Sequence, residues 1–511
     1  MSDNSSNNKR IAKNTILLYF RMLIMMAVTL YTSRVVLATL GVEDFGIYNV
    51  VGGVVMMFAF LNGTISGVTQ RYITYELGTG NKKNLQVVFN TSMCIHWLIA
   101  FIILLLAETI GLWFVLHKLV IPEARMTAAI WVYQFSILST IVLIVSIPYN
   151  ACIIAHERMS AFAYISIVEV MLKLLVVYLL LLSDGDKLIL YAFLIFTVQL
   201  LIRFVYTIYC KRHFEESRYK LSMDKALTKK MMGFTGWSLF GGFASVGMTQ
   251  GVNILLNLFF GPLVNAARAI AVQVESAIMA FSTNFQMALN PQIIKNYASG
   301  NLIQMQKLVY ASCRYSYYLL FALSMPIFIE ANFILHLWLT NVPEHSVSLV
   351  RYTLLIMMID CMAKPIMTAA NATGNIKRYQ TVVGTLMLLI IPISYVMLLV
   401  IEKPEIVFVV YLSLVIISLF VRLWIVKDLL GLSVAWFLNI VLKPVMLVTI
   451  ASVIAPALCY SVIVNELLQF AIVTTVSIAS SLLSIYYIGI NDDERNLVKY
   501  YMKKLFKYGN N

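Results

Sequence analysis

The stretch that decides the fold begins at Gly41 with GVEDFGIYNV and ends at Asn81 with LGTGN. It returns in the second half of the chain, where a stretch of the same length begins at Gly261 and ends at Asn301 with YASGN. The identities between the two copies are few, but they preserve the glycines at both ends. A weak internal repeat of this length is typical of membrane proteins built from two similar modules. The repeat therefore predicts two similar lobes.

Further matching residues occur in the same order in both halves of the chain. The residues that match between the two stretches and their immediate continuation are Gly41, Ile73, Gly80, Asn81, Gln86 and Ser92. Pro122-Glu123 corresponds to Pro343-Glu344 in the second half. Pro148 and Ala155 correspond to Pro365 and Ala372.

Composition places the chain in a membrane. Of its 511 residues 60% are hydrophobic and 12% are charged, and the mean hydropathy is +0.84; soluble domains carry about 25% charged residues. The six cysteines are scattered and contain no CxxC pair, so we expect small core residues and neither a disulfide set nor a metal site. They are Cys94, Cys152, Cys210, Cys313, Cys361 and Cys459.

Apolar runs of about 20 residues predict an all-α polytopic membrane protein with about fourteen transmembrane helices. The expected spans are 14–38, 44–68, 87–108, 127–149, 161–182, 188–209, 232–258, 266–290, 309–330, 347–370, 380–401, 406–426, 438–463 and 469–490. They divide into a six-helix lobe at 1–220, a second at 221–430 in a pseudo-two-fold repeat, and two extra helices at 431–490.

Lys and Arg residues indicate the orientation. They gather at both termini and in every second connection, which predicts that both termini are cytoplasmic. The net charge of +14 is then mostly a topology signal and requires no nucleic-acid partner. The basic segment 210–230 is the expected linker between the lobes. The tail at 491–511 places aromatic and leucine side chains among lysines, which predicts an amphipathic helix on anionic lipids.

Signatures of catalysis are absent from the sequence. It contains no GxxxxGK[ST] phosphate loop, no HExxH and no GxSxG. The connections on the outer side are short, with little room for an enzymatic domain. We therefore expect no catalytic residue and no cofactor, and energy from an ion gradient, the membrane potential or the substrate gradient.

Charged and polar residues within the spans are the candidate functional residues, because a charge at mid-bilayer costs about 2.5–3.5 kcal/mol. Arg21 and Arg34 occupy the first span, and Arg268 opens the eighth, where Glu275 and Ser282 share its face. Cavity-lining polar residues are expected at Gln250, Asn253, Asn257 and Glu275. Arg203, Arg314, Arg351, Arg422 and Lys443 are expected to reach the nearest span end.

Two acid–base pairs have the i,i+4 spacing that favours an ion pair on one helix. They are Glu169 with Lys173 and Asp360 with Lys364. One interpretation is an internal ion pair that faces the helix bundle. The other is a gate or a proton-sensitive coupling switch.

Several motifs resemble the polysaccharide flippases of the Wzx type, which share a superfamily with multidrug and toxin extrusion (MATE) exporters. The motifs are Ser33-Arg34-Val35-Val36-Leu37, Leu40-Gly41-Val42-Glu43-Asp44-Phe45-Gly46-Ile47-Tyr48, Gln70-Arg71-Tyr72, Leu77-Gly78-Thr79-Gly80-Asn81 and Asn290-Pro291-Gln292-Ile293. The resemblance implies two six-helix lobes around a central cavity. It implies a substrate of undecaprenyl-pyrophosphate-linked oligosaccharide, flipped to the periplasmic leaflet by alternating access. By the same resemblance, Arg21 or Arg34, together with Arg268, would hold the pyrophosphate.

Other functions stay open on the sequence. An ion-coupled drug exporter of the same fold would need an acidic and aromatic site, and twelve spans would suffice for it. A membrane enzyme of polysaccharide assembly is disfavoured by the short outer connections, and a structural scaffold leaves the polar spans unexplained. We expect a monomer that works beside other polysaccharide-assembly proteins.

Overall fold

The computed structural model describes residues 2–56, 59–117, 119, 121–183, 185–218, 224–339, 342–492, 494–496 and 499, and within these ranges some side chains of α1 and α2 are not described. The described residues are almost entirely helical and contain no strand. The elements are α1 (Ser2–Met56), α2 (Ala59–Thr79), α3 (Lys82–Leu106), η1 (Ala107–Gly111), α4 (Leu112–His117), η2 (Glu123–Arg125), α5 (Met126–Ala155), α6 (Met159–Leu181), α7 (Lys187–His213), η3 (Glu215–Ser217), α8 (Lys225–Phe260), α9 (Pro262–Ala298), α10 (Leu302–Ile329), α11 (Ala331–Trp338), α12 (Ser346–Thr373), α13 (Lys377–Leu388), α14 (Ile390–Val400), α15 (Glu405–Leu430), α16 (Val434–Phe437), η4 (Leu438–Leu442), α17 (Lys443–Val462), α18 (Glu466–Ser484) and η5 (Ile485–Gly489).

The protein is a multi-pass membrane protein. Among the described residues, 11 helices are long and apolar enough to cross a bilayer, or 12 if α10 and α11, bent by 80° at their junction, form one span. The expected number of fourteen is therefore not reached in the described part, and the first two expected spans lie partly outside it. The expected amphipathic tail at 491–511 also lies mostly outside the described residues.

The glycines that end the two repeated stretches all have positive φ. Gly41 and Gly261 have φ of +79° and +74°, and Gly80 and Gly300 have φ of +74° and +78°. Positive φ is strained for residues with a side chain and open to glycine. Gly41 accordingly interrupts α1 with non-helical dihedrals. The sequence repeat is thus a repeat of helix breaks.

A third pair of corresponding positions also has positive φ, but only one of its two residues is a glycine. Gly374 after α12 has φ +78°, and Glu157 after α5 has φ +58°. A left-handed non-glycine residue costs about 1–2 kcal/mol. Glu157 is 4% exposed; its carboxylate forms an ion pair with Lys295 at 2.6 Å and accepts a hydrogen bond from Gln292. These contacts offset the strain and fix the turn between α5 and α6.

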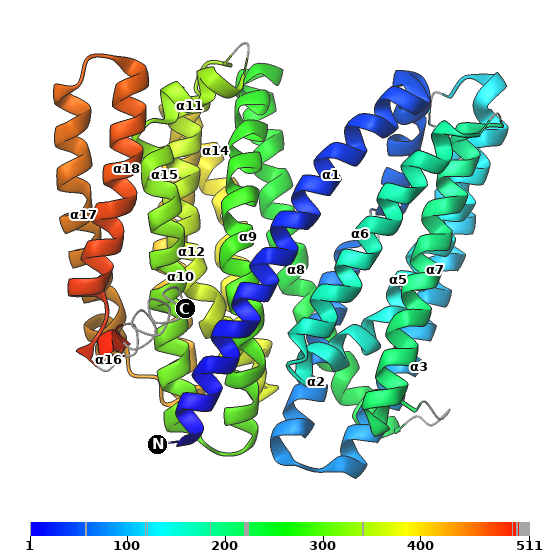
Figure 1. The fold of residues 1–511 in the computed structure, drawn as a ribbon, viewed down its shortest axis with the longest axis horizontal. Helices are drawn as coiled ribbons and strands as arrows, with labels where there is room; N and C mark the ends of the chain where they lie inside the picture. Colours follow the sequence, from blue (N-terminus) through cyan, green and yellow to red (C-terminus); the bar gives the residue numbers. More distant parts are fainter. Residues whose placement is uncertain are drawn as a thin grey trace, which may run out of the picture. The chain divides into compact units, whose positions relative to one another are not determined.

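The chain divides into two compact units. Unit 1 comprises Met1–Gly242 and Pro291–Asn301, and unit 2 comprises Phe243–Asn290 and Leu302–Asn511. In unit 1, α5 lies along α7 and contacts α2, α3 and α1 (Figure 1). In unit 2, α12 packs between α10 and α15, and the antiparallel pair α17 and α18 contacts α10 (Figure 1).

One end of unit 1 is fastened by a charged network. The guanidinium of Arg125 contacts Asp44 at 2.6 Å and Asp186 at 2.8 Å. Asp186 also caps α7 by accepting from the backbone N–H of Leu188. Partial burial acts to raise the pKa of Asp186, but the hydrogen bonds from Arg125 and from backbone N–H groups hold it below its ordinary value. The network therefore ties α1, η2 and α7 together.

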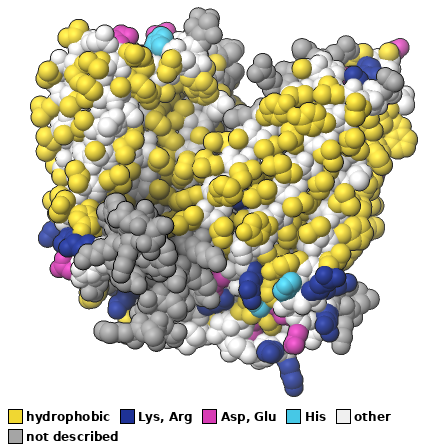
Figure 2. Space-filling model, in the orientation of Figure 1, with side chains coloured by type: hydrophobic (Ala, Val, Ile, Leu, Met, Phe, Trp, Pro, Cys, Tyr) yellow, Lys and Arg dark blue, Asp and Glu magenta, His cyan; other side chains and the backbone are white. Residues whose placement is uncertain are grey.

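Large apolar side chains cover the outer faces of the helices, as Figure 2 shows on one side of the molecule. Trp97, Phe101 and Trp113 are each more than half exposed. Exposure of this extent is costly in water and favourable in lipid. Lys and Arg side chains gather toward the helix ends in the same view, as expected for membrane-spanning helices.

The positive-φ glycines give a direct stability test. Gly300→Ala should lower stability by about 1–2 kcal/mol, because a Cβ makes φ of +78° unfavourable although nothing lies within 4 Å of it. The matched control is Gly67→Ala, since Gly67 lies inside α2 with equally open surroundings, where alanine favours the helix. Thermal unfolding in detergent measures both. Equal midpoints for the two variants would contradict the assignment.

Candidate functional site

A cavity of about 550 Å³ lies inside unit 1, bounded by α1, α5, α6 and α7. On α1 and α5 its polar lining consists of Ser and Thr side chains spaced three or four residues apart, as on one face of a helix. These side chains share one face of each helix and turn it toward the cavity. The polar lining residues are Thr29, Thr32, Ser136, Ser139, Thr140, Lys173 and Gln199.

A second cavity of about 170 Å³ adjoins the first, because Leu143 and Gln199 line both. Its wall holds three charged side chains from three helices: Arg21 of α1, Glu169 of α6 and Arg203 of α7. Amide and hydroxyl side chains fill the spaces between them. These are Ser146, Asn150, Ser166 and Tyr206.

The ion pair expected between Glu169 and Lys173 is present in unit 1. Their Oε1 and Nζ atoms are 2.6 Å apart, and the amide of Gln199 donates to the same carboxylate at 3.5 Å. Lys173 lines the larger cavity and Glu169 the smaller one. The pair therefore lies at the junction of the two cavities.

The two arginines of the smaller cavity are held by aromatic faces. The guanidinium of Arg21 lies 4.5 Å from the centre of the Phe162 ring, and that of Arg203 lies 4.9 Å from the Tyr149 ring. Arg203 also donates to the backbone carbonyl of Val145. The expectation that Arg203 reaches the end of its span is therefore wrong, because a backbone acceptor and an aromatic face hold it inside the bundle.

Electrostatically, this pair of cavities is cationic. The charged side chains among its lining residues are three bases, Arg21, Lys173 and Arg203, and one acid, Glu169. The Nε atom of Arg21 is buried and has no hydrogen-bond partner among the described residues. An anion is the complement of such a site, because an uncompensated charge away from water is costly.

Unit 2 contains a second charged cluster, in which acids and bases are nearly equal in number. The charges of Arg268, Asp360 and Lys364 act on Glu275. Arg268 is 5% exposed and donates to the carbonyl of Thr249 at 3.1 Å; its Nη1 atom is buried without a hydrogen-bond partner among the described residues. Arg422 also interacts with Asp360, so three bases face two acids in this cluster, a smaller excess of positive charge than in unit 1.

The expected ion pair between Asp360 and Lys364 is not formed in the described part of the chain, where no ion pair within 4.0 Å joins them. Both members of the expected pair have charged neighbours on other helices, since Lys364 interacts with Glu275 of α9 and Asp360 interacts with Arg422 of α15. The i,i+4 spacing allows an ion pair on one helix. It carries no information about charged side chains on neighbouring helices.

The remaining candidates have less distinct surroundings. Asn253 donates to Gln250 at 3.1 Å, so these two side chains do share a helix face, and Asn257 is exposed one turn further on. The side chain of Arg34 lies outside the described residues. The structure therefore brings Arg21 together with Glu169, and brings Arg268 together with Glu275.

Sequence reasoning missed the contribution of α7. Gln199, Arg203 and Tyr206 are spaced four and three residues apart, which puts them on one helix face. Ser146 and Asn150 have the same relation on α5. This polar spacing inside apolar spans was the signal that could have found the smaller cavity.

Comparison with known proteins defines the fold. Neither a family model nor a curated protein matches the sequence. Among solved structures, an outward-facing multidrug resistance MATE transporter of the MOP superfamily aligns with a TM-score of 0.70 at 14% identity, over 84% of this chain and 97% of that one. The MATE transporter ClbM, solved in complex with Rb⁺, aligns with a TM-score of 0.68 at 14% identity, over 84% and 96%.

The Vibrio cholerae MATE transporter VcmN in its bent form gives a TM-score of 0.64 at 17% identity, over 84% of this chain and 98% of that one. The chain therefore has the two-lobed all-helical fold of MATE transporters. At these identities the likeness establishes the fold alone.

Water access to the larger cavity can be measured by cysteine labelling. Ser139→Cys should react with a charged, membrane-impermeant thiol reagent, because a hydrated polar cavity allows the thiolate to form. The control is Leu138→Cys on the same helix, 40% exposed on an apolar surface, where burial in lipid suppresses the thiolate. Both variants carry Cys94→Ser and Cys459→Ser, since the other four cysteines are buried. Equal reactivity would contradict the cavity.

Proposed function

We propose that the protein is a flippase that moves undecaprenyl-pyrophosphate-linked oligosaccharide from the cytoplasmic to the periplasmic leaflet for surface polysaccharide synthesis. The observation that carries the proposal is the cationic cavity of unit 1, with Arg21, Lys173 and Arg203 against the single carboxylate of Glu169. The fold supports transport as the class of function. The Wzx-like motifs at both ends of the first repeat support a lipid-linked saccharide as the class of substrate.

The chemistry of the head group fits this cavity. A pyrophosphate is a compact dianion, and guanidinium groups bind phosphate oxygens through two parallel hydrogen bonds. The Glu169 carboxylate, already paired with Lys173, limits the net attraction. A substrate that must be released on the other side of the membrane cannot be bound too tightly, as it would be by basic side chains without an acidic partner. The hydroxyl and amide groups of α1, α5 and α7 offer hydrogen bonds to sugar hydroxyls.

The membrane potential assists such a substrate. Moving one elementary charge across 100 mV is worth about 2.3 kcal/mol. A dianion that leaves a negative cytoplasm therefore gains about 5 kcal/mol per 100 mV. Arg21 and Arg203 lower the opposing cost of bringing the head group out of water. This account needs no nucleotide hydrolysis and no catalytic residue.

The rest of the proposal concerns the setting in the cell. The protein acts in the inner membrane, where its proposed substrate is made. Both termini lie in the cytoplasm, an orientation that the Lys and Arg distribution of the connections favours. Transport proceeds by alternating access, in which the substrate site opens first to the cytoplasmic and then to the periplasmic side. The protein works as a monomer, with anionic lipids at its basic surface and other polysaccharide-assembly proteins nearby.

An ion-coupled multidrug exporter is the second candidate. Glu275 and Asp360 favour it, because two carboxylates within one another's field in unit 2 can take up a proton or a cation. One of the similar solved structures is that of a multidrug resistance transporter. Against this candidate stands the excess of bases in unit 1, which disfavours a cationic drug.

Arg21 provides the discriminating test. In proteoliposomes, Arg21→Gln should slow the flipping of a fluorescent polyprenyl-pyrophosphate saccharide about 10- to 100-fold, because charged hydrogen bonds worth about 1.5–3 kcal/mol are lost. Arg21→Lys keeps the charge and should retain part of the rate. The matched control is Arg212→Gln, at the exposed end of α7.

A cationic dye is the second substrate in the same vesicles. The flippase proposal expects no dye extrusion by the unmodified protein. Dye extrusion driven by a proton gradient, together with unchanged lipid flipping in Arg21→Gln, would contradict the flippase proposal and support the exporter.

A further inference from the structure

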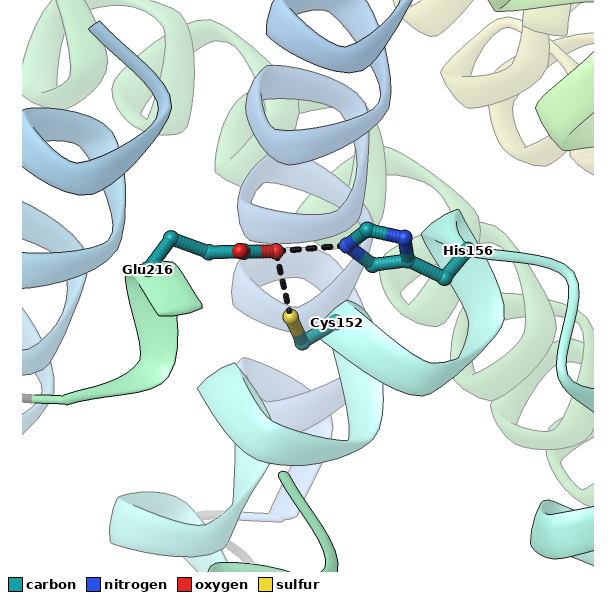
Figure 3. Close-up of side chains that lie close together, drawn as sticks. All are labelled: Cys152, His156 and Glu216. Carbon is teal, nitrogen blue, oxygen red and sulfur yellow. Dashed lines mark hydrogen bonds and ion pairs between the residues drawn. The ribbon is translucent and has the colours of Figure 1, made fainter. Parts of the chain in front are cut away.

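Three side chains with metal-binding atoms converge at one end of unit 1, outside the two cavities. Cys152 and His156 lie one helical turn apart at the end of α5, and Glu216 lies in η3. Figure 3 shows the three side chains pointing toward one another. Their thiol sulfur, imidazole nitrogen and carboxylate oxygen all lie within 4.8 Å of one another. None of them belongs to the proposed transport path.

We propose that Cys152, His156 and Glu216 form a binding site for a divalent transition metal ion of the zinc type, which fastens η3 to α5. Thiolate sulfur, imidazole nitrogen and carboxylate oxygen are the ligands that zinc takes in proteins. A thiolate and a carboxylate together neutralise a divalent ion. The result is a site without net charge, which suits a buried position close to the membrane.

The distances fit tetrahedral coordination with a small adjustment. The Cys152 sulfur lies 3.5 Å from the Glu216 oxygen. Bonds of about 2.3 Å to sulfur and about 2.0 Å to oxygen at a tetrahedral angle place these atoms about 3.5 Å apart. The Nε2 atom of His156 lies 2.5 Å from the same oxygen and must move out to about 3.3 Å. A water molecule would complete the four ligands.

Neighbouring residues hold the ligands in place. The ring of Phe214 stacks on that of His156, with centroids 4.1 Å apart and planes at 12°. Ser217 is fully buried and donates to the carbonyl of Phe214 at 2.8 Å, which fixes η3. Glu216 itself is 8% exposed. Supporting contacts of this kind orient ligands and raise metal affinity.

Metal binding replaces protons. The Cys152 thiol donates to Glu216, and the His156 ring shares a hydrogen with the same carboxylate. On binding, the thiol proton is released to solvent, and a second proton follows if the imidazole is protonated; no redox change occurs. Affinity therefore rises with pH. Element η3 lies near the start of the expected linker at 210–230. A bound ion would therefore fix the position at which that linker leaves α7.

The test uses the full-length protein, purified in detergent with a tag free of histidine. Titration with Co²⁺ should give about one ion per chain, with the charge-transfer absorption of a cobalt–thiolate bond. Cys152→Ser should abolish this absorption. His156→Gln and Glu216→Gln should each weaken binding more than 10-fold, since even outer contacts are worth 10- to 100-fold. Cys313→Ser, a buried cysteine in unit 2, is the control that keeps the absorption.

Three results would overturn the proposal. One is the absence of thiolate absorption in the unmodified protein, which depends on no variant folding correctly. The second is absorption of unchanged strength and affinity in Cys152→Ser, and the third is unchanged affinity in both His156→Gln and Glu216→Gln. Elution of each variant as a single species on gel filtration accompanies every titration.

Discussion

A charge inside the bilayer must have a partner or reach water, and this constraint shapes both units of the protein. In unit 2 the constraint is met largely within the protein, because Arg268, Lys364 and Arg422 face Glu275 and Asp360. In unit 1 it is met only in part, because Arg21, Lys173 and Arg203 share the one carboxylate of Glu169. The surplus positive charge has no protein counterion among the described residues of the cavity wall, and an anionic substrate supplies one.

The repeat explains how similar modules carry different charges. The helix breaks at Gly41 and Gly261, and at Gly80 and Gly300, depend on backbone conformation and tolerate few side chains. Cavity-facing positions are under no such restriction. Glu157, which takes the place of a glycine and holds Lys295, shows that even a break can be adapted when contacts offset its strain.

Features that depend on neighbours along the chain could be predicted from the sequence. Hydropathy predicted an all-helical membrane protein, and the spacing of Glu169 and Lys173 predicted their ion pair. Features that depend on packing between helices could not. Arg203 is held by a carbonyl on α5, and Lys364 interacts with Glu275 on another helix. Cys152 contacts Glu216, which follows two further helices along the chain.

The most direct measurement of the central claim is a cryo-electron microscopy structure in lipid nanodiscs with a polyprenyl-pyrophosphate saccharide bound. The account predicts density for the two phosphates between α1, α5, α6 and α7, within ion-pair distance of the Arg21 guanidinium. Phosphate density confined to the outer apolar faces, with the unit 1 cavities holding only water, would contradict it.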